Sequence, residues 1–285
     1  MDNRPIGVFD SGLGGLTVVK ALKELLPNES IVYFGDTARL PYGVKSQDLV
    51  KQYSKEIIKF LLEKNAKAVI IACNTATAMA LNSLKNEFKD IPIIGVIDPG
   101  SEKAIFETVT KKIGVIGTIA TISSGAYEKS IQQKNNKVKI ISKACPLFVP
   151  FVEEGLINGP AINEIAKHYL SSFNNNVDTL ILGCTHYPLL KDIIFDNTEN
   201  INLIDSASSV AEVAYKILLQ RKLLSDKKNL GALDCYVTDL PMRFEELGNI
   251  FFGTDITNVK LISITHQISA IILLEIILYS LQQGI

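Results

Sequence analysis

The chain has no excess of charge of either sign. Its 29 Lys and Arg residues nearly balance 30 Asp and Glu residues, which gives a formal net charge of -1 at pH 7. A protein that holds a polyanion through its overall field carries a clear basic surplus. The balance therefore makes nucleic acid a poor candidate for a partner.

Cysteine pairs at metal-binding or redox spacing are also missing. The chain has four cysteines that lie far apart, namely Cys73, Cys145, Cys184 and Cys235. They form no Cys-x-x-Cys motif and have no histidine at zinc-finger spacing. We therefore expect no structural metal site.

No long apolar run is present either. Residues 1–12 lack the apolar stretch of a signal peptide, so we expect a cytoplasmic protein with reduced cysteines. The most apolar segment, residues 268–281, is interrupted by Glu275 and is shorter than the roughly 20 residues of a membrane-spanning helix. We interpret it as a terminal helix that packs on the body of the protein or on a dimer partner, and expect no membrane contact.

What the sequence does contain is a regular alternation of short apolar runs and amphipathic segments. With 285 residues, 47% of them apolar, it is long enough for about two domains with sizeable cores. Uniformly apolar strands between helices are typical of parallel sheets covered on both faces, so the predicted class is α/β. The expected strands cover residues 5–9, 31–35, 68–72, 92–96, 112–117, 137–142, 178–183, 202–206, 232–237 and 259–264. The expected helices include 15–26, 48–64 and 77–88, with further helix starts at Pro160 and Ser206.

The chain also resembles itself. IGVFDSG at residue 6 returns as IGVIGTI at residue 113, and AVIIACNTA around Cys73 returns as TLILGCTHY around Cys184. Any two buried strands look somewhat alike, but the similar endings around the two cysteines favour a duplicated design. We therefore expect two α/β lobes of similar build.

Small polar clusters come after four of the expected strands, where a buried core would end. They are Asp10-Ser11-Gly12, Asp36-Thr37, Cys73-Asn74-Thr75 and Cys184-Thr185-His186. Ligands of open parallel sheets bind beyond the carboxyl ends of the strands. We expect these clusters to form one cleft.

The turn DSGLGGL, residues 10–16, has glycines but not the spacing of a nucleotide-binding loop. The third glycine of G-x-G-x-x-G would fall at Thr17, and no Gly-Lys-Ser/Thr comes after it. A dinucleotide is therefore not expected. The glycines instead allow a small anion to approach a helix N-terminus closely, or they simply form a tight turn.

Two thiols that face each other across a cleft fit two kinds of chemistry. One is disulfide exchange, which usually employs Cys-x-x-Cys or a resolving cysteine on a flexible segment. The other is proton transfer on opposite faces of one carbon, which inverts the stereocentre. Cys73 and Cys184 are the candidate bases, with Asp10 and His186 as neighbours that help to move their protons.

The other cysteines and histidines are interpreted as structural. Cys145 precedes Pro146 and Cys235 lies inside LDCYV, and we interpret both as buried cysteines that behave as small hydrophobic residues. His168 lies in an amphipathic segment, and His266 lies near the apolar tail.

Five motifs, in this order, closely resemble the glutamate racemases: FDSGLGGL (9–16), GDTARLPYG (35–43), ACNTATA (72–78), CPLFVPFVEEG (145–155) and GCTHYPLL (183–190). These enzymes interconvert L- and D-glutamate without a cofactor and supply the D-isomer for bacterial peptidoglycan. The resemblance spans residues 6 to about 262. It implies two similar lobes, each a mostly parallel sheet flanked by helices, with the active site in the cleft between them. The implied first lobe comprises residues 1–96 and 210–285, the second residues 97–209, and the family is commonly dimeric.

Carried over position by position, the resemblance implies a role for each site residue. Cys184 would take the α-proton from L-glutamate with the help of His186, and Cys73 would take it from D-glutamate with the help of Asp10. Glu153 would be a carboxylate near the substrate ammonium or near His186. The implied substrate-binding residues are Asp10, Ser11, Pro41, Tyr42, Gly43, Cys73, Asn74, Thr75, Thr118, Thr121, Cys184, Thr185 and His186. No cofactor and no metal are implied.

Two alternatives stay open. An aspartate racemase of the same superfamily would use the same thiol pair, but it usually has an acid where this chain has His186 and lacks the DSGLGG turn. A non-catalytic regulator that binds an amino acid would keep the site, although both thiols are retained here. Residues 265–285 match nothing expected of the family.

Overall fold

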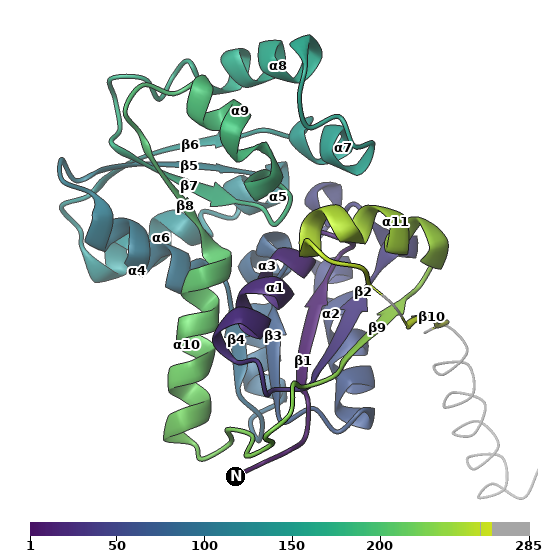
Figure 1. Ribbon diagram of the computed structural model, residues 1–285. Helices are drawn as coiled ribbons and strands as arrows, with labels where there is room; N and C mark the ends of the chain where they lie inside the picture. Colours follow the sequence, from purple (N-terminus) through teal and green to yellow (C-terminus); the bar gives the residue numbers. More distant parts are fainter. Residues whose placement is uncertain (257, 264–285) are drawn as a thin grey trace, which may run out of the picture.

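Two parallel sheets organise the chain (Figure 1). The computed structural model describes residues 1–256 and 258–263. In spatial order, the larger sheet consists of β10 (Val259–Leu261), β9 (Leu233–Val237), β2 (Ile31–Gly35), β1 (Ile6–Asp10), β3 (Ala68–Ile71) and β4 (Ile93–Gly95). The smaller sheet consists of β6 (Lys139–Ala144), β5 (Lys112–Gly117), β7 (Thr179–Gly183) and β8 (Asn202–Asp205). All pairings in both sheets are parallel, and the predicted α/β class is confirmed.

The two sheets share a topology. The order β2-β1-β3-β4 in the larger sheet is repeated as β6-β5-β7-β8 in the smaller one. The strand that precedes Cys73 pairs with β1, and the strand that precedes Cys184 pairs with β5. The internal sequence echo therefore reflects two lobes of similar build, as predicted.

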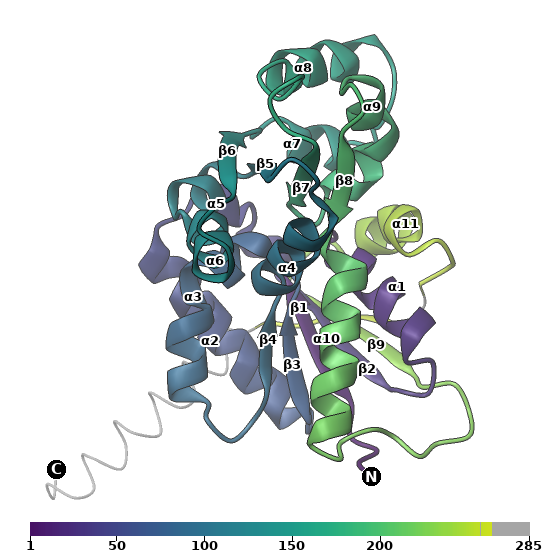
Figure 2. The ribbon, with the colours of Figure 1, turned by 90° about the vertical axis from the view of Figure 1, so that its left-hand side faces the viewer.

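Helices cover both sheets (Figures 1 and 2). Those that begin in the first part of the chain are α1 (Leu16–Leu25), α2 (Gln47–Glu63), α3 (Asn74–Glu87), α4 (Ile97–Glu107), α5 (Ile119–Ser123) and α6 (Ala126–Lys134). They are followed by α7 (Phe148–Glu153), α8 (Pro160–Leu170), α9 (Lys191–Asp196), α10 (Ser206–Gln220) and α11 (Pro241–Phe252). The described part of the chain also has the short 3-10 helices η1 (Thr37–Arg39), η2 (Tyr42–Val44) and η3 (Tyr187–Leu190).

Some boundaries differ from the sequence-based expectation. The helix expected at 77–88 begins three residues earlier, at Asn74, because the Cys73 side chain caps it by accepting the N–H of Ala76. The strand expected at 137–142 is displaced to Lys139–Ala144, because its register is set by pairing with β5. The expected helix starts at Pro160 and Ser206 are confirmed.

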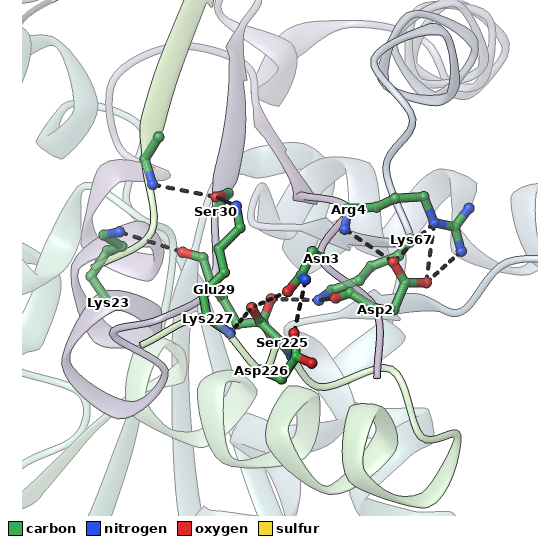
Figure 3. A network of polar contacts seen from close by, with 11 residues as sticks. Asp2, Asn3, Arg4, Lys23, Glu29, Ser30, Lys67, Ser225, Asp226 and Lys227 are labelled. Atoms are coloured by element: carbon green, nitrogen blue, oxygen red, sulfur yellow. Dashed lines mark hydrogen bonds and ion pairs between the residues drawn. The ribbon is translucent and has the colours of Figure 1, made fainter. Parts of the chain in front are cut away.

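A network of polar contacts lies at the edge of the larger sheet where the strands begin, opposite their carboxyl ends (Figure 3). The buried Lys67 ammonium lies 2.5 Å from the Glu29 carboxylate and also donates to the carbonyl of Asp2. The other oxygen of Glu29 accepts the N–H of Ser225, in the segment after α10. Because the charges are paired and hydrogen-bonded, their burial is tolerated. The network joins the N-terminal residues to the chain segment that returns from the smaller sheet.

The chain passes between the sheets twice. α4 follows β4 into the smaller sheet, and α10 follows β8 back to the larger one, where it packs on α1. The division into residues 1–96 with 210–285 and residues 97–209 stays a prediction. Within the described residues no helix is both long and apolar enough to cross a bilayer. The apolar segment 268–281 lies outside the described residues, so its interpretation is unchanged.

Candidate active site

A cavity of about 180 Å³ lies at the carboxyl ends of β1, β3, β5 and β7, between the two sheets. Its wall comes from both lobes and holds a thiol from each. The predicted residues that line it are Ser11, Pro41, Tyr42, Gly43, Cys73, Asn74, Thr75, Thr118, Glu153, Cys184, Thr185 and His186. A cavity of this size suits a small metabolite.

Two predicted residues, Asp10 and Thr121, lie behind the wall of the cavity. The Thr121 hydroxyl is 3.2 Å from the hydroxyl of Thr75 and 3.0 Å from that of Thr118, which both line the cavity. The Thr75 and Thr118 hydroxyls are themselves 2.9 Å apart. Thr121 therefore completes a triangle of hydroxyl groups that joins the lobes without reaching the cavity.

Cys73 lies at the N-terminus of α3. Its sulfur accepts the N–H of Ala76 at 3.4 Å and lies 3.9 Å from the hydroxyl oxygen of Ser11. Burial raises the pKa of the Cys73 thiol to about 12, with a further contribution from the negative charge of Asp10. At neutral pH Cys73 is therefore a protonated thiol in this structure.

Cys184 is the first member of a hydrogen-bonded chain. Its sulfur lies 3.7 Å from Nδ1 of His186, and Nε2 of His186 lies 3.1 Å from Oε1 of Glu153. Burial alone would lower the pKa of His186, but the interactions with Cys184 and Glu153 outweigh it and raise this pKa to about 10. Glu153 thus lies beside His186 and also lines the cavity, and its position near a substrate ammonium stays a prediction.

Asp10 ends β1 and is fully buried. Its carboxylate accepts the N–H of Gly12 at 3.0 Å and the hydroxyl of Thr185 at 3.2 Å. Burial raises the pKa of Asp10, while the charge of His186 and the hydrogen bonds oppose this effect. Asp10 makes no hydrogen bond to the Cys73 thiol among residues 1–256 and 258–263. Asp10 therefore acts on that thiol through its negative charge, which contributes to the raised pKa of Cys73.

The glycine-rich turn brings the two lobes into contact. A Cβ atom at Gly14 would lie 2.2 Å from Oγ1 of Thr185 and 2.7 Å from Nδ1 of His186. Only glycine leaves room for these side chains. At Gly14 the close approach is made by side chains of the second lobe, and the approach of a small anion to this turn stays a prediction.

Pro41, Tyr42 and Gly43 line the cavity, and a buried carboxylate holds Tyr42 in place. Asp36 accepts hydrogen bonds from the Tyr42 hydroxyl and from Nε of Arg39. A Cβ atom at Gly43 would lie 2.7 Å from Cβ of Thr118, so this position needs glycine. These three residues line the cavity, and their binding of substrate stays a prediction. The expectation that Asp36 and Thr37 also belong to the cleft was wrong, because Asp36 lies behind the wall and binds Tyr42.

Sequence reasoning missed α11, which packs beside the chain of Cys184, His186 and Glu153. The ring of Phe251 lies edge-on to His186, with 5.6 Å between ring centroids. Arg243 donates to the backbone carbonyl of Glu153 at 3.2 Å and to the Glu154 carboxylate at 2.8 Å. No motif marks these residues, because they reach the site only through the fold of the chain.

The cavity contains few charged side chains. Of its described lining residues, none is Lys or Arg, and Glu153 is the acid. Across residues 1–256 and 258–263, no group of three or more His, Cys, Asp and Glu side chains is placed to hold a metal ion. The site therefore offers thiols, hydroxyls, helix N–H groups and an imidazole with a raised pKa.

These features define a class of protein: two α/β lobes of equal strand order that bring one thiol each to a shared cavity. A family model described as Asp/Glu/Hydantoin racemase matches residues 6–214. The glutamate racemase of Chlorobaculum tepidum is 47% identical, over 90% of this chain and 96% of the relative.

Solved structures agree with this comparison. Glutamate racemase from Francisella tularensis subsp. tularensis SCHU S4, in complex with D-glutamate, has a TM-score of 0.88 and 43% identity, covering 93% of this chain and 99% of that one. A glutamate racemase isoform of Bacillus anthracis has a TM-score of 0.88 and 39% identity, covering 92% and 98%. The chain therefore belongs to the Asp/Glu/Hydantoin racemase family, and within it to the glutamate racemases.

Proposed function

We propose that this protein interconverts L- and D-glutamate without a cofactor, using Cys73 and Cys184 as bases on opposite faces of the α-carbon. The observation that carries the proposal is that both thiols line one cavity, each after the equivalent strand of its lobe. Membership of the glutamate racemases supports the choice of substrate.

The reaction needs a proton acceptor and a proton donor at the same time. From L-glutamate, the Cys184 thiolate takes the α-proton while the Cys73 thiol gives its own proton to the other face. From D-glutamate the two cysteines exchange roles. Proton exchange with solvent then restores the starting protonation state of each thiol. His186, with its pKa raised to about 10, is a cation at neutral pH and stabilises the Cys184 thiolate. The protonated Cys73 is already the donor that L-glutamate requires.

The carbanion intermediate must be stabilised without an electron sink. The N–H groups of Asn74 and Thr75 lie at the start of α3, before its first intrahelical hydrogen bond, so they can bind the substrate α-carboxylate. Hydroxyl groups of Thr75 and Thr118 add donors in a cavity whose polar groups are fixed in advance. We further propose that the lobes close on the substrate by bending at α4 and α10. Equal small-angle scattering curves with and without glutamate would contradict this closure.

The central test is turnover of both enantiomers, followed by circular dichroism with no added cofactor. We expect L- and D-glutamate each to lose optical activity. A wild-type protein inert toward both would refute the proposal and leave a non-catalytic regulator. Turnover of aspartate at a rate equal to or above that of glutamate would favour the aspartate racemase alternative.

The product suggests the cellular role. We propose that the D-glutamate formed here supplies peptidoglycan synthesis in the cytoplasm and that the enzyme is a homodimer, as the family resemblance implies. Light scattering with and without glutamate tests the dimer, and a monomeric mass under both conditions would exclude it.

A further inference from the structure

Tyr127 is a buried residue that none of the proposed proton transfers uses. It lies in the first turn of α6, has 1% of its surface exposed and belongs to the smaller sheet's lobe. α6 packs against α4, and α4 packs against α10 (Figure 2). The Tyr127 hydroxyl oxygen lies 3.3 Å from that of Ser206 in α10 and would lie 3.8 Å from a Cβ atom at Gly100 in α4, so this tyrosine reaches both crossings between the lobes.

The ring of Tyr127 packs against the residue that precedes Cys184. A Cβ atom at Gly183 would lie 3.0 Å from Cε2 of Tyr127 and 2.6 Å from the carbonyl oxygen of Ile116. Gly183 therefore fits between a neighbouring strand and the aromatic ring. The ring limits how far the end of β7 can move toward α6.

The hydroxyl of Tyr127 contacts the residue next to Cys73 in the chain. It donates to Oδ1 of Asn74 at 2.7 Å, across the lobe boundary. It also lies 3.3 Å from the hydroxyl oxygen of Ser206, the first residue of α10. A Cβ atom at Gly100, in α4, would lie 2.6 Å from that Ser206 oxygen, so small residues of both crossings surround the contact. One side chain thus touches the chain neighbour of each thiol and the start of the returning helix.

We infer that Tyr127 is a positioning residue that sets the spacing of the two thiols when the lobes close. The inference rests on the proposed function, because only a two-base reaction needs both sulfurs at one carbon atom. A rigid ring at Gly183 and a hydrogen bond at Asn74 fix the two strand ends relative to each other. Misplacement by about 1 Å can cost roughly a hundredfold in rate. A reaction that uses one thiol does not depend on this spacing.

The test compares a two-base with a one-base reaction in Tyr127→Phe, which keeps the ring and removes the hydroxyl. The one-base reaction is loss of water from β-hydroxyglutamate. One thiolate takes the α-proton, the bond from the β-carbon to oxygen breaks, and hydroxide leaves as water with a proton from solvent. The enamine product then takes up water and yields 2-oxoglutarate and ammonia, which are measured.

We expect Tyr127→Phe to lower kcat for glutamate racemisation about tenfold, because Asn74 loses its donor, and to leave the elimination rate within about twofold. The matched control is Tyr169→Phe, which removes the hydroxyl that accepts the N–H of Leu147 at a place outside the cavity lining. Both of its rates should equal those of the wild type. Ser206→Ala, which spares the Asn74 bond, should lower the ratio of racemisation to elimination less than Tyr127→Phe does.

Three results would overturn the inference. Equal losses of racemisation and elimination in Tyr127→Phe would indicate general destabilisation, and an unchanged racemisation rate would show that the hydroxyl has no role. A lower ratio of racemisation to elimination in Ser206→Ala than in Tyr127→Phe would show that α10, and not the bond to Asn74, sets the spacing of the thiols. An inert wild type would refute the proposed function itself, so the two failures are distinguishable.

Discussion

The two cysteines follow equivalent strands but have different surroundings. Cys73 follows β3 and caps the long helix α3, and its sulfur lies 3.9 Å from the hydroxyl oxygen of Ser11. Cys184 follows β7 and enters a bend and the short helix η3, so His186 two residues later can turn back toward the sulfur. One topology thus gives the two thiols different polar neighbours.

The difference lies in the backbone conformation after each strand. A helix that starts directly after Cys73 offers N–H groups and no titratable partner. The irregular turn after Cys184 brings in an imidazole and, through it, the carboxylate of Glu153. Helix geometry would have pointed His186 away from the residue two positions before it. The duplicated fold brings both thiols to one cavity, and the local backbone sets which polar groups surround each thiol.

Removing one thiol at a time is expected to have the largest effect and tests whether the two cysteines have different roles. We expect Cys73→Ser and Cys184→Ser each to lower racemisation by about 10³-fold or more, because each removes an essential acid-base group. Elimination from β-hydroxyglutamate should separate them by configuration at the α-carbon. The L-isomer should still react in Cys73→Ser and the D-isomer in Cys184→Ser. The reverse pattern would exchange the assigned roles.

Removing the imidazole tests the device on the Cys184 side. We expect His186→Gln to lower kcat about a hundredfold, with His168→Gln, at an exposed position of α8, as the control.

The same variants test a pH effect on stability. The folded pKa of His186, about 10, lies above its reference value of 6.5. Its contribution to stability is therefore fully present below about pH 6.5 and lost as the pH rises through about 10. In urea unfolding at pH 6.5 and pH 10, the wild type and His168→Gln should lose stability over this interval, and His186→Gln should lose less. Parallel loss in all three proteins would be incompatible with a raised His186 pKa.

Neutralising the carboxylate behind the imidazole should have a smaller effect. Glu153→Gln removes a charge-assisted hydrogen bond, so we expect a tenfold to hundredfold decrease in kcat, which is about the value of one such bond. The pKa of His186, followed by NMR, should fall in this variant because the negative charge is lost. The control is Glu154→Gln, since Glu154 is the exposed neighbour that binds Arg243 and not His186. If both variants behaved alike, Glu153 would have no special role.

The smallest effect is expected on the Cys73 side. Ser11→Ala removes a weak contact with the Cys73 sulfur, so we expect a roughly twofold to fivefold decrease in kcat. A decrease as large as that of Glu153→Gln would mean that the two sides depend on their polar neighbours equally. Steady-state rates from both enantiomers give this comparison.

Much of the fold follows from local patterns. The strands were predictable because a strand that is buried on both faces has a uniformly apolar sequence. The internal echo was predictable because two lobes of the same build repeat such sequences. The helix starts at Pro160 and Ser206 were predictable as well. The start of α3 was placed too late, because a thiol that caps a helix does not belong to the usual capping residues. The register of β6 could not be predicted, since it depends on its partner strand.

By itself the sequence determined the α/β class, the polar strand ends and, through its motifs, the family and the two thiols, all of which are properties of neighbouring residues. Only the tertiary structure decided which groups act together. Glu153 meets His186 across 33 residues, Asp10 binds Thr185 across 175, and Tyr127 reaches Asn74 across 53. Partners so distant in the chain are chosen by the packing of the lobes, which no local pattern encodes.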